Sequence, residues 1–121
     1  MNDIYNRRNT IFCVERESDR YPEKIAVHKG MPRKLWYMGR MPDPNRSVAI
    51  VGARRSTAYG NAMAKLFAEH LAEAGVQIIS GMAWGIDSYA HEGALKADGD
   101  TFAVLGCGVD VCYPAGQRHL Y

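Results

Sequence analysis

The stretch VAIVGARRSTAYGNAMAKL, residues 48–66, contains the signals that decide the fold. VAIV is an uninterrupted apolar run, which is typical of a strand covered on both faces, and it stops at Gly52. Thr57 can cap a helix that we expect over about residues 58–74, with Gly75 closing it. The inward positions expected for this helix, at spacings of three and four, are Met63, Leu66, Phe67, Leu71 and Ala74.

The same alternation continues toward the C-terminus. VQIIS (76–80) predicts a second strand, and GMAWG (81–85) predicts a loop. A second helix follows, with Asp87 expected as its N-cap, Gly99 at its end, and inward positions at Ala90, Ala94, Leu95 and Ala97. TFAVLG (101–106) predicts a third strand. This order indicates right-handed crossovers. We therefore expect an α/β fold: a Rossmann-like, three-layer parallel sheet with helices on both faces, plus short N-terminal strands.

Residues 1–46 have a different character and contain four of the five prolines. TIFCVE (10–15) and KLWYMGR (34–40) have strand character, and the polar segment between them has room for one short helix. MPDPNRS (41–47) is typical of a linker, because proline removes a backbone donor and biases its predecessor to extended geometry. We predict an N-terminal extension over 1–46 and the N-terminal part of a Rossmann-like core over 47–121. Whether the N-terminal strands extend the sheet or pack as a separate flap stays open.

Composition favours a soluble domain with one core, since 47% of the residues are hydrophobic and 23% are charged. The net charge of +2 is too small to indicate nucleic-acid binding by itself, although the N-terminal part is the more basic one. No apolar stretch is long enough to span a bilayer or to form a secretory signal, so we expect a cytoplasmic protein without a membrane partner. The three cysteines, Cys13, Cys107 and Cys112, are not arranged with CxxC spacing. We therefore expect reduced thiols, no metal site and no cofactor.

Ligands of open parallel sheets bind at the carboxyl ends of the strands, and the first turn at that edge carries two arginines. Gly52 permits a tight turn, while Arg54 and Arg55 offer forked donors. Ser56, Thr57 and the first amides of the helix can complete an anion cradle. Positive charge at a helix N-terminus opposes the helix dipole unless an anion is bound, which favours a phosphate site with Arg54 ahead of Arg55. The alternative is that both arginines are solvated loop residues.

The second loop offers Ser80 and Gly81, a small pair that lets a phosphate or sugar approach the backbone. Asp87 suits a helix cap better than a catalytic acid. His91, one turn later, suits structural support better than catalysis, because no metal ligand or nucleophile stands at an informative spacing. Trp84 can stack on a base or simply pack, and its role stays open.

In the third loop, Gly106 and Gly108 make a turn, after which Asp110, Tyr113 and Pro114 are expected to form a fixed segment. The GCG at its start lacks the rest of a GxGxxG fingerprint, and no GxxxxGK[ST] occurs in the chain. Dinucleotide-dependent dehydrogenases and P-loop NTPases therefore lose their main support.

The ordered segments SVAIVGARRSTAYG, IISGMAWGIDSYAHEGAL and TFAVLGCGVDVCYP resemble the DNA-processing protein A (DprA, or Smf) family. The resemblance implies a Rossmann-like fold that binds single-stranded DNA through phosphate-binding loops, protects it, and helps to load the RecA recombinase during natural transformation. It implies no catalytic activity. By motif, phosphate contacts fall on Gly52, Arg54, Ser80, Gly81 and Gly106. Loop support falls on Tyr59, Gly60, Gly85, Asp87, His91, Asp110, Tyr113 and Pro114.

Members of the resembled family normally continue further, with more DNA contacts and a dimerisation surface, so we expect a partial core. A first strand left at an open sheet edge predicts a homo-oligomer, unless the N-terminal strands cover that edge. The competing hypothesis is a nucleotide-binding or nucleotide-hydrolysing enzyme similar to the lysine-decarboxylase-like phosphoribohydrolases. Their PGGxGT-type loop is absent from this sequence.

Overall fold

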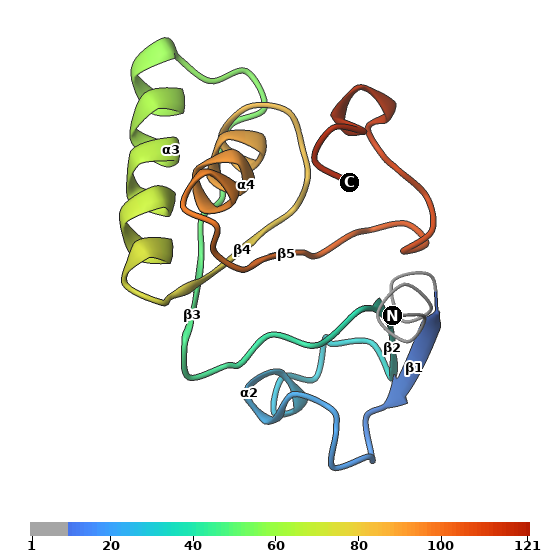
Figure 1. Cartoon of the computed structure of the whole chain (residues 1–121). Coiled ribbons are helices and arrows are strands. Elements are labelled where there is room, and N and C mark those ends of the chain that lie inside the picture. Colours follow the sequence, from blue (N-terminus) through green and yellow to red (C-terminus); the bar gives the residue numbers. More distant parts are fainter. Residues whose placement is uncertain (1–9) are drawn as a thin grey trace, which may run out of the picture.

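The computed structural model of the chain describes residues 10–121 and contains two small sheets (Figure 1). In both sheets, helices connect successive strands along the chain. The N-terminal elements are β1 (Ile11–Glu15), α2 (Glu23–Ala26) and β2 (Lys34–Met38). The remaining elements are β3 (Ser47–Ala49), α3 (Ala58–Glu73), β4 (Gln77–Ser80), α4 (Ile86–Lys96), β5 (Thr101–Ala103) and the 3₁₀ turn η1 (Ala115–Gln117). The mixed α/β class with a parallel sheet and short N-terminal strands is confirmed.

The parallel sheet has the order β3-β4-β5, with β4 in the centre. Val48 pairs with Ile78 and Ile79 pairs with Phe102, so consecutive strands are neighbours throughout. The pairing continues one residue past two of the strands, because the amides of Ile50 and Val104 donate to carbonyls of β4 at 2.9 and 2.8 Å. All three strands therefore end at one common edge, where the three long loops begin.

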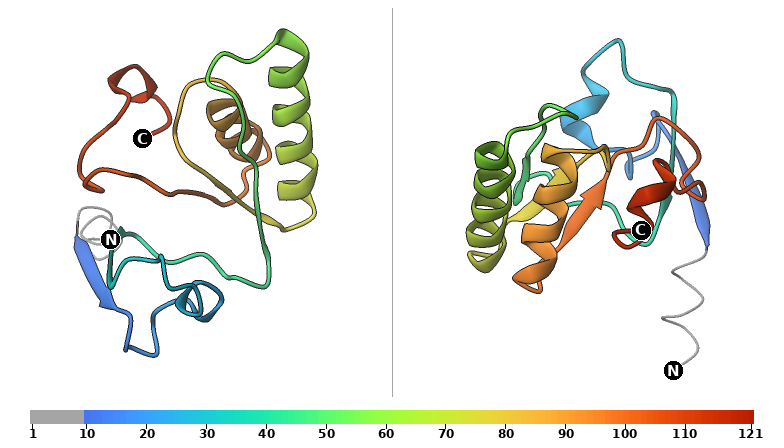
Figure 2. Two further views of the ribbon diagram at one scale, coloured as in Figure 1. Left: turned by 180° about the vertical axis from the view of Figure 1, so that it is seen from behind. Right: turned by 90° about the horizontal axis from the view of Figure 1, so that it is seen from above.

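Both crossover helices lie on the same face of this sheet (Figures 1 and 2). Each right-handed crossover advances the sheet by one strand in the same direction, so α3 and α4 fall side by side instead of on opposite faces. We expected helices on both faces of the sheet, but neither crossover helix covers the second face. On that side the linker amide of Asp43 donates to Oε1 of Gln77 at 2.7 Å, and the Arg40 guanidinium lies 5.2 Å from the Phe102 ring centre.

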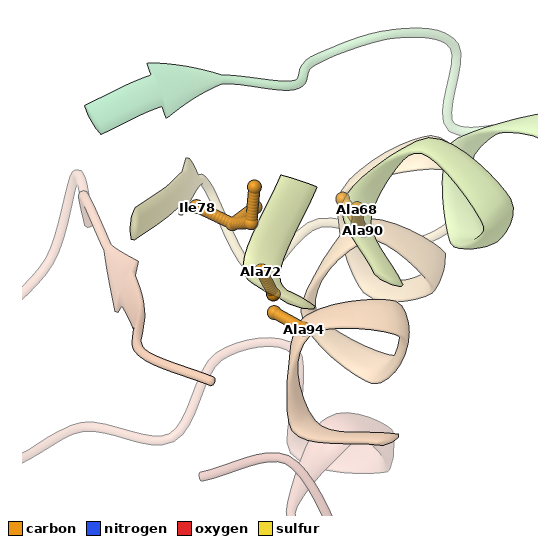
Figure 3. Packing of buried hydrophobic residues seen from close by; sticks show 5 residues of the cluster. All are labelled: Ala68, Ala72, Ile78, Ala90 and Ala94. Carbon is orange, nitrogen blue, oxygen red and sulfur yellow. The ribbon is translucent and has the colours of Figure 1, made fainter. Parts of the chain in front are cut away.

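The core is a seam of small side chains between the two crossover helices and β4 (Figure 3). Ile78 of β4 is fully buried, and a Cβ on Gly93 would collide with the Lys65 carbonyl oxygen, so α3 and α4 approach very closely. The residues of the core cluster are Ala68, Ala72, Ile78, Ala90 and Ala94. The predicted inward face was wrong for the larger side chains, since Phe67 is 61% exposed and Leu66 and Leu95 are also exposed.

The helix ends follow the predicted signals in α3 but not in α4. Thr57 is the N-cap of α3, and its Oγ1 accepts a hydrogen bond from the Gly60 amide at 3.0 Å. Gly75 follows the helix with a φ of 80°, as the C-terminal signal predicted. The prediction of Asp87 as the N-cap of α4 was wrong: Gly85 is the N-cap, and Asp87 lies in the first turn of the helix.

The N-terminal segment forms its own antiparallel hairpin and does not extend the parallel sheet. Its central anchor is Arg16, whose guanidinium donates to the carbonyl oxygens of Ala26, His28 and Met31 and so ties α2 to the hairpin. Tyr21, 4% exposed, donates to the Pro32 carbonyl at 2.7 Å. Within residues 10–121, the outer edge of β3 therefore pairs with no strand.

Candidate functional site

A cleft of about 450 Å³ lies at the carboxyl edge of the parallel sheet, where the loops after β3, β4 and β5 meet. We call these loop 1 (50–57), loop 2 (81–85) and loop 3 (104–114). All three contribute to the walls of the cleft, which are formed by Arg54, Gly81, Ala83, Trp84, Leu105, Gly106, Cys107, Tyr113 and Pro114. Five of the residues predicted from the sequence as contacts or loop support are thus brought together: Arg54, Gly81, Gly106, Tyr113 and Pro114.

Loop 1 presents donors without acceptors. Within residues 10–121, no hydrogen bond engages the backbone amides of residues 51–59. The Arg54 side chain likewise makes no ion pair and no hydrogen bond in the described chain. Unpaired amides beside a free guanidinium, at the start of a sixteen-residue helix, form an electropositive surface suited to an anion. Arg55 is exposed but does not line the cleft.

Two glycines fix loop 2 directly against loop 1. The Ile86 amide donates to the Ala53 carbonyl at 3.2 Å, which joins the start of α4 to the backbone of loop 1. Gly85 has a φ of 80°, and a Cβ there would collide with the Ala53 carbonyl oxygen. A Cβ on Gly52 would come within 2.7 Å of Ile86 Cγ1. The spacing between the loops is therefore set by packing in which neither glycine can carry a side chain.

Several predicted site residues support these loops from behind. Ser80 is 2% exposed and its hydroxyl donates to the Ile50 carbonyl at 2.6 Å, a position that does not suit the phosphate contact expected from the sequence. Asp87 accepts a hydrogen bond from the Gly81 amide at 3.1 Å and holds the turn that lines the cleft. At the start of α3, the Ser56 hydroxyl donates to the Asn61 side-chain oxygen, and Gly60 packs near Ile86.

His91 supports loop 2 in one defined tautomer. The Thr101 hydroxyl donates to the Ile78 carbonyl at 3.0 Å, so Nδ1 of His91 must donate to Thr101 Oγ1 at 2.6 Å. The other ring nitrogen, Nε2, then accepts from the Met82 amide at 3.3 Å, where Met82 has a φ of 61°. Burial lowers the pKa of His91 below its usual value, while the charge of Asp87 acts in the opposite direction. The neutral ring thus positions the loop.

Loop 3 closes the cleft, and the 3₁₀ turn η1 that follows it holds Trp84 in place. A Cβ on Gly116 would collide with the Trp84 indole, and the Gln117 side chain, 2% exposed, donates to the Ala83 carbonyl at 3.5 Å. Sequence reasoning missed both residues, and no local pattern marks them because their partners lie about thirty positions away. Tyr113 is 65% exposed at the cleft, and Asp110 and Tyr59 are exposed outside its wall.

The wall of the cleft offers groups that can bind and position a ligand. Among the described residues, no group of three or more His, Cys, Asp or Glu side chains lies close enough to hold a metal ion. Its wall combines one guanidinium, backbone amides and glycines with two aromatic rings, Trp84 and Tyr113. Glycines let a ligand approach the backbone, and Gly106 has open space where a Cβ would stand. Such a surface suits a ligand that carries both phosphate and apolar groups.

The fold and this cleft define a Rossmann-like α/β protein with its candidate ligand site at the carboxyl edge of the sheet. The chain belongs to the DNA recombination-mediator protein A family, whose family model matches residues 12–121. No helix within residues 10–121 is both long enough and apolar enough to cross a membrane.

The chain is 34% identical over 122 residues to Protein Smf of Synechocystis sp., a match that covers 97% of this chain and 30% of the relative. The X-ray structure of DNA processing protein A from Streptococcus pneumoniae superimposes with a TM-score of 0.75 at 27% identity, covering 99% of this chain and 43% of that one. A structure of DNA processing protein A from Helicobacter pylori, described for its single-stranded DNA binding mode, gives a TM-score of 0.74 at 30% identity. The match covers 92% of this chain and 49% of the Helicobacter pylori chain. The chain therefore spans less than half of each of these relatives.

Proposed function

We propose that this chain is a single-stranded DNA-binding module whose cleft takes the sugar–phosphate backbone at the carboxyl edge of the parallel sheet. The observation that carries the proposal is the Arg54 guanidinium, which lines the cleft and, within residues 10–121, has no carboxylate partner. The Helicobacter pylori relative, which has a similar fold, is described as binding single-stranded DNA, and this supports the choice of ligand.

The proposed binding is electrostatic and tolerant of sequence. Phosphate oxygens are to be held by Arg54, by the amides of loop 1 and by the N-terminus of α3, with Gly52, Arg55 and Gly81 as further proposed contacts. None of these groups reads a base edge, so the affinity should fall with salt and vary little with sequence. Three other residues proposed from the sequence act instead through the loop geometry, because their side chains are already hydrogen-bonded: Ser56, Thr57 and Ser80.

We propose a binding role rather than catalysis. His91 is hydrogen-bonded to loop 2, but both of its ring nitrogens are engaged and it is only 2% exposed. It is therefore poorly placed to act as a general acid or base. The nucleotide-hydrolysing alternative, of the lysine-decarboxylase-like phosphoribohydrolase type, predicts release of free base when the chain is incubated with a nucleoside monophosphate. The binding proposal predicts no release, and the measurement is chromatographic detection of the base.

The test is the affinity for oligothymidylate at about 50 and 200 mM salt, with a mononucleotide as the low-valence control. The unmodified chain should bind the oligomer far more tightly than the mononucleotide and should lose affinity as salt rises. Arg54→Ala should weaken binding and reduce the salt slope by about one phosphate contact.

Arg33→Ala is the matched control for charge. Arg33 lies in the N-terminal segment, pairs with Glu17 at 3.3 Å and is highly exposed, so its loss removes the same charge away from the cleft. The control variant should retain the affinity and the salt slope of the unmodified chain. Equal weakening by both substitutions would mean that net charge, and not the cleft, attracts the DNA.

We further propose, from the family alone, that the function includes loading of RecA onto single-stranded DNA during DNA uptake. The family description as a recombination mediator supports this extension. Because the chain spans less than half of its relatives, the test is whether it stimulates RecA filament formation on DNA that it demonstrably binds.

A further inference from the structure

Trp84 is a large aromatic side chain of the cleft that lies outside the hydrophobic core cluster. It is 50% exposed and lines the same wall as Arg54 and Tyr113. Within residues 10–121, its ring has neither an aromatic neighbour nor a cation above it, since the ring contacts found there are Phe12 with Tyr37 and Arg40 with Phe102. One face or edge of the indole is therefore available to a ligand in the cleft.

The structure also holds this ring in place before any ligand binds. The indole rests against Gly116, where any side chain would collide with it. Gln117 binds the carbonyl of Ala83, the residue before Trp84, and Gly85 after it is closed against loop 1. An indole fixed from the protein side loses little conformational freedom when it binds a flat partner. This preorganisation distinguishes Trp84 from Trp36, which is exposed on the β1–β2 hairpin.

The partner that fits is a flat aromatic group attached to phosphate. The cleft volume of about 450 Å³ lies within the range that holds small organic ligands. Arg54 supplies a charge for phosphate, and the rings of Trp84 and Tyr113 supply apolar faces in the same wall. Stacking on an aromatic side chain requires a base that is not paired and stacked inside a duplex.

We propose that Trp84 is a base-stacking platform, so that the cleft binds an unpaired nucleobase together with its phosphate. This inference rests on the proposed function, because Arg54 and loop 1 must first hold the backbone. Stacking gives a preference for single-stranded over double-stranded DNA that phosphate contacts alone cannot give. It requires no base-edge hydrogen bonds, so it preserves tolerance of sequence.

The test compares oligothymidylate with an abasic oligomer of the same length, which carries the same phosphates but no bases. The unmodified chain should bind oligothymidylate at least about fivefold more tightly than the abasic oligomer. Trp84→Ala should bring this ratio close to one, while Trp84→Phe should restore much of it. Trp36→Ala, on the hairpin, should leave the ratio unchanged.

A fluorescence measurement gives an independent readout. In a Trp36→Phe background Trp84 is the remaining tryptophan, and its emission should be quenched by oligothymidylate and not by the abasic oligomer. A ratio near one for the unmodified chain, or one that Trp84→Ala leaves unchanged, overturns the stacking role while the phosphate site stands. Failure of both oligomers to bind overturns the proposed function and the platform together.

Discussion

Gly85 lets loop 1 and loop 2 of the cleft lie closer together than any other residue would permit. Its φ of 80° and ψ of −132° belong to a region that essentially only glycine adopts, and a Cβ would meet the Ala53 carbonyl oxygen. Gly85→Ala should therefore lower the free energy of unfolding by at least about 2 kcal/mol, measured by urea denaturation. Gly30→Ala is the control, because open space surrounds that position, and it should change stability little.

If Gly85→Ala proved as stable as Gly30→Ala, the contact between loops 1 and 2 would not be the rigid support that the cleft requires. The same substitution should also reduce DNA binding at temperatures where the variant is folded, because it displaces the backbone of loop 1. If Gly85→Ala lost stability but still bound DNA with unchanged affinity, Gly85 would support the fold without determining the shape of the cleft.

His91 makes stability depend on pH. Its pKa is lowered in the folded state by burial, so the unfolded chain binds the proton more readily. The contribution of the neutral ring is fully present above about pH 6.5, the ordinary histidine value, and is lost as pH falls through the folded pKa. The urea midpoint should accordingly fall between about pH 7.5 and 5.5 in the unmodified chain.

The control for this pH profile is His28→Gln, which changes an exposed histidine of the N-terminal segment and should leave the profile unchanged. His91→Gln should flatten the profile in the same window, whatever its overall cost in stability. If the pH profile kept its slope in His91→Gln, the pH dependence would come from other groups. The neutral His91 ring that hydrogen-bonds Thr101 and Met82 would then not be its source.

At the scale of elements, the contact between α3 and α4 depends on the absence of large side chains. Gly93 lies against the Lys65 carbonyl and the Ala68 methyl group, so Gly93→Ala forces the helices apart and should cost about 1–3 kcal/mol. Phe67→Ala removes a much larger side chain but one that is 61% exposed, and it should cost little. Thermal denaturation of both variants measures the contrast, and the reverse order of stability would contradict this packing.

The sequence allowed the order of elements to be predicted, because that information is local. The apolar run at VAIV, the cap at Thr57 and the glycine after α3 all mark their positions without reference to the rest of the chain. The buried face of α3 could not be found in this way, since periodicity selects large apolar residues such as Phe67. The true face consists of alanines that a neighbouring helix approaches closely, which only the tertiary structure specifies.

The site was predictable to a similar degree. The predicted ends of the strands located the three loops of the cleft. The unfavourable position of a positive charge at the N-terminus of α3 pointed to Arg54, which does line the cleft. Ser80 was expected to face the ligand, but its position inside the strand ladder directs its hydroxyl to the Ile50 carbonyl. Gly116 and Gln117 escaped prediction because their roles depend on contacts with the second loop, far away in the sequence.

At the scale of the whole molecule, the outer edge of β3, which within residues 10–121 pairs with no strand, should promote self-association. The edge strand bears the exposed Val48, and Val51, two residues after β3, is also exposed. We expect a mass above 13.5 kDa in size-exclusion chromatography with light scattering, rising with concentration. Val48→Lys should shift the chain toward the monomer, because charge on an edge strand opposes pairing. A monomer at every concentration would show that the edge is protected in some other way.

The central claim is that DNA phosphates contact the amides of loop 1 and the guanidinium beside them. The most direct measurement is a titration of the isotope-labelled chain with oligothymidylate, followed by amide NMR. The largest shifts are predicted within residues 51–59 and at Gly81 and Gly106, weakening as salt is added. Shifts confined to the β1–β2 hairpin, or unchanged amides throughout loop 1 at saturating DNA, would contradict it.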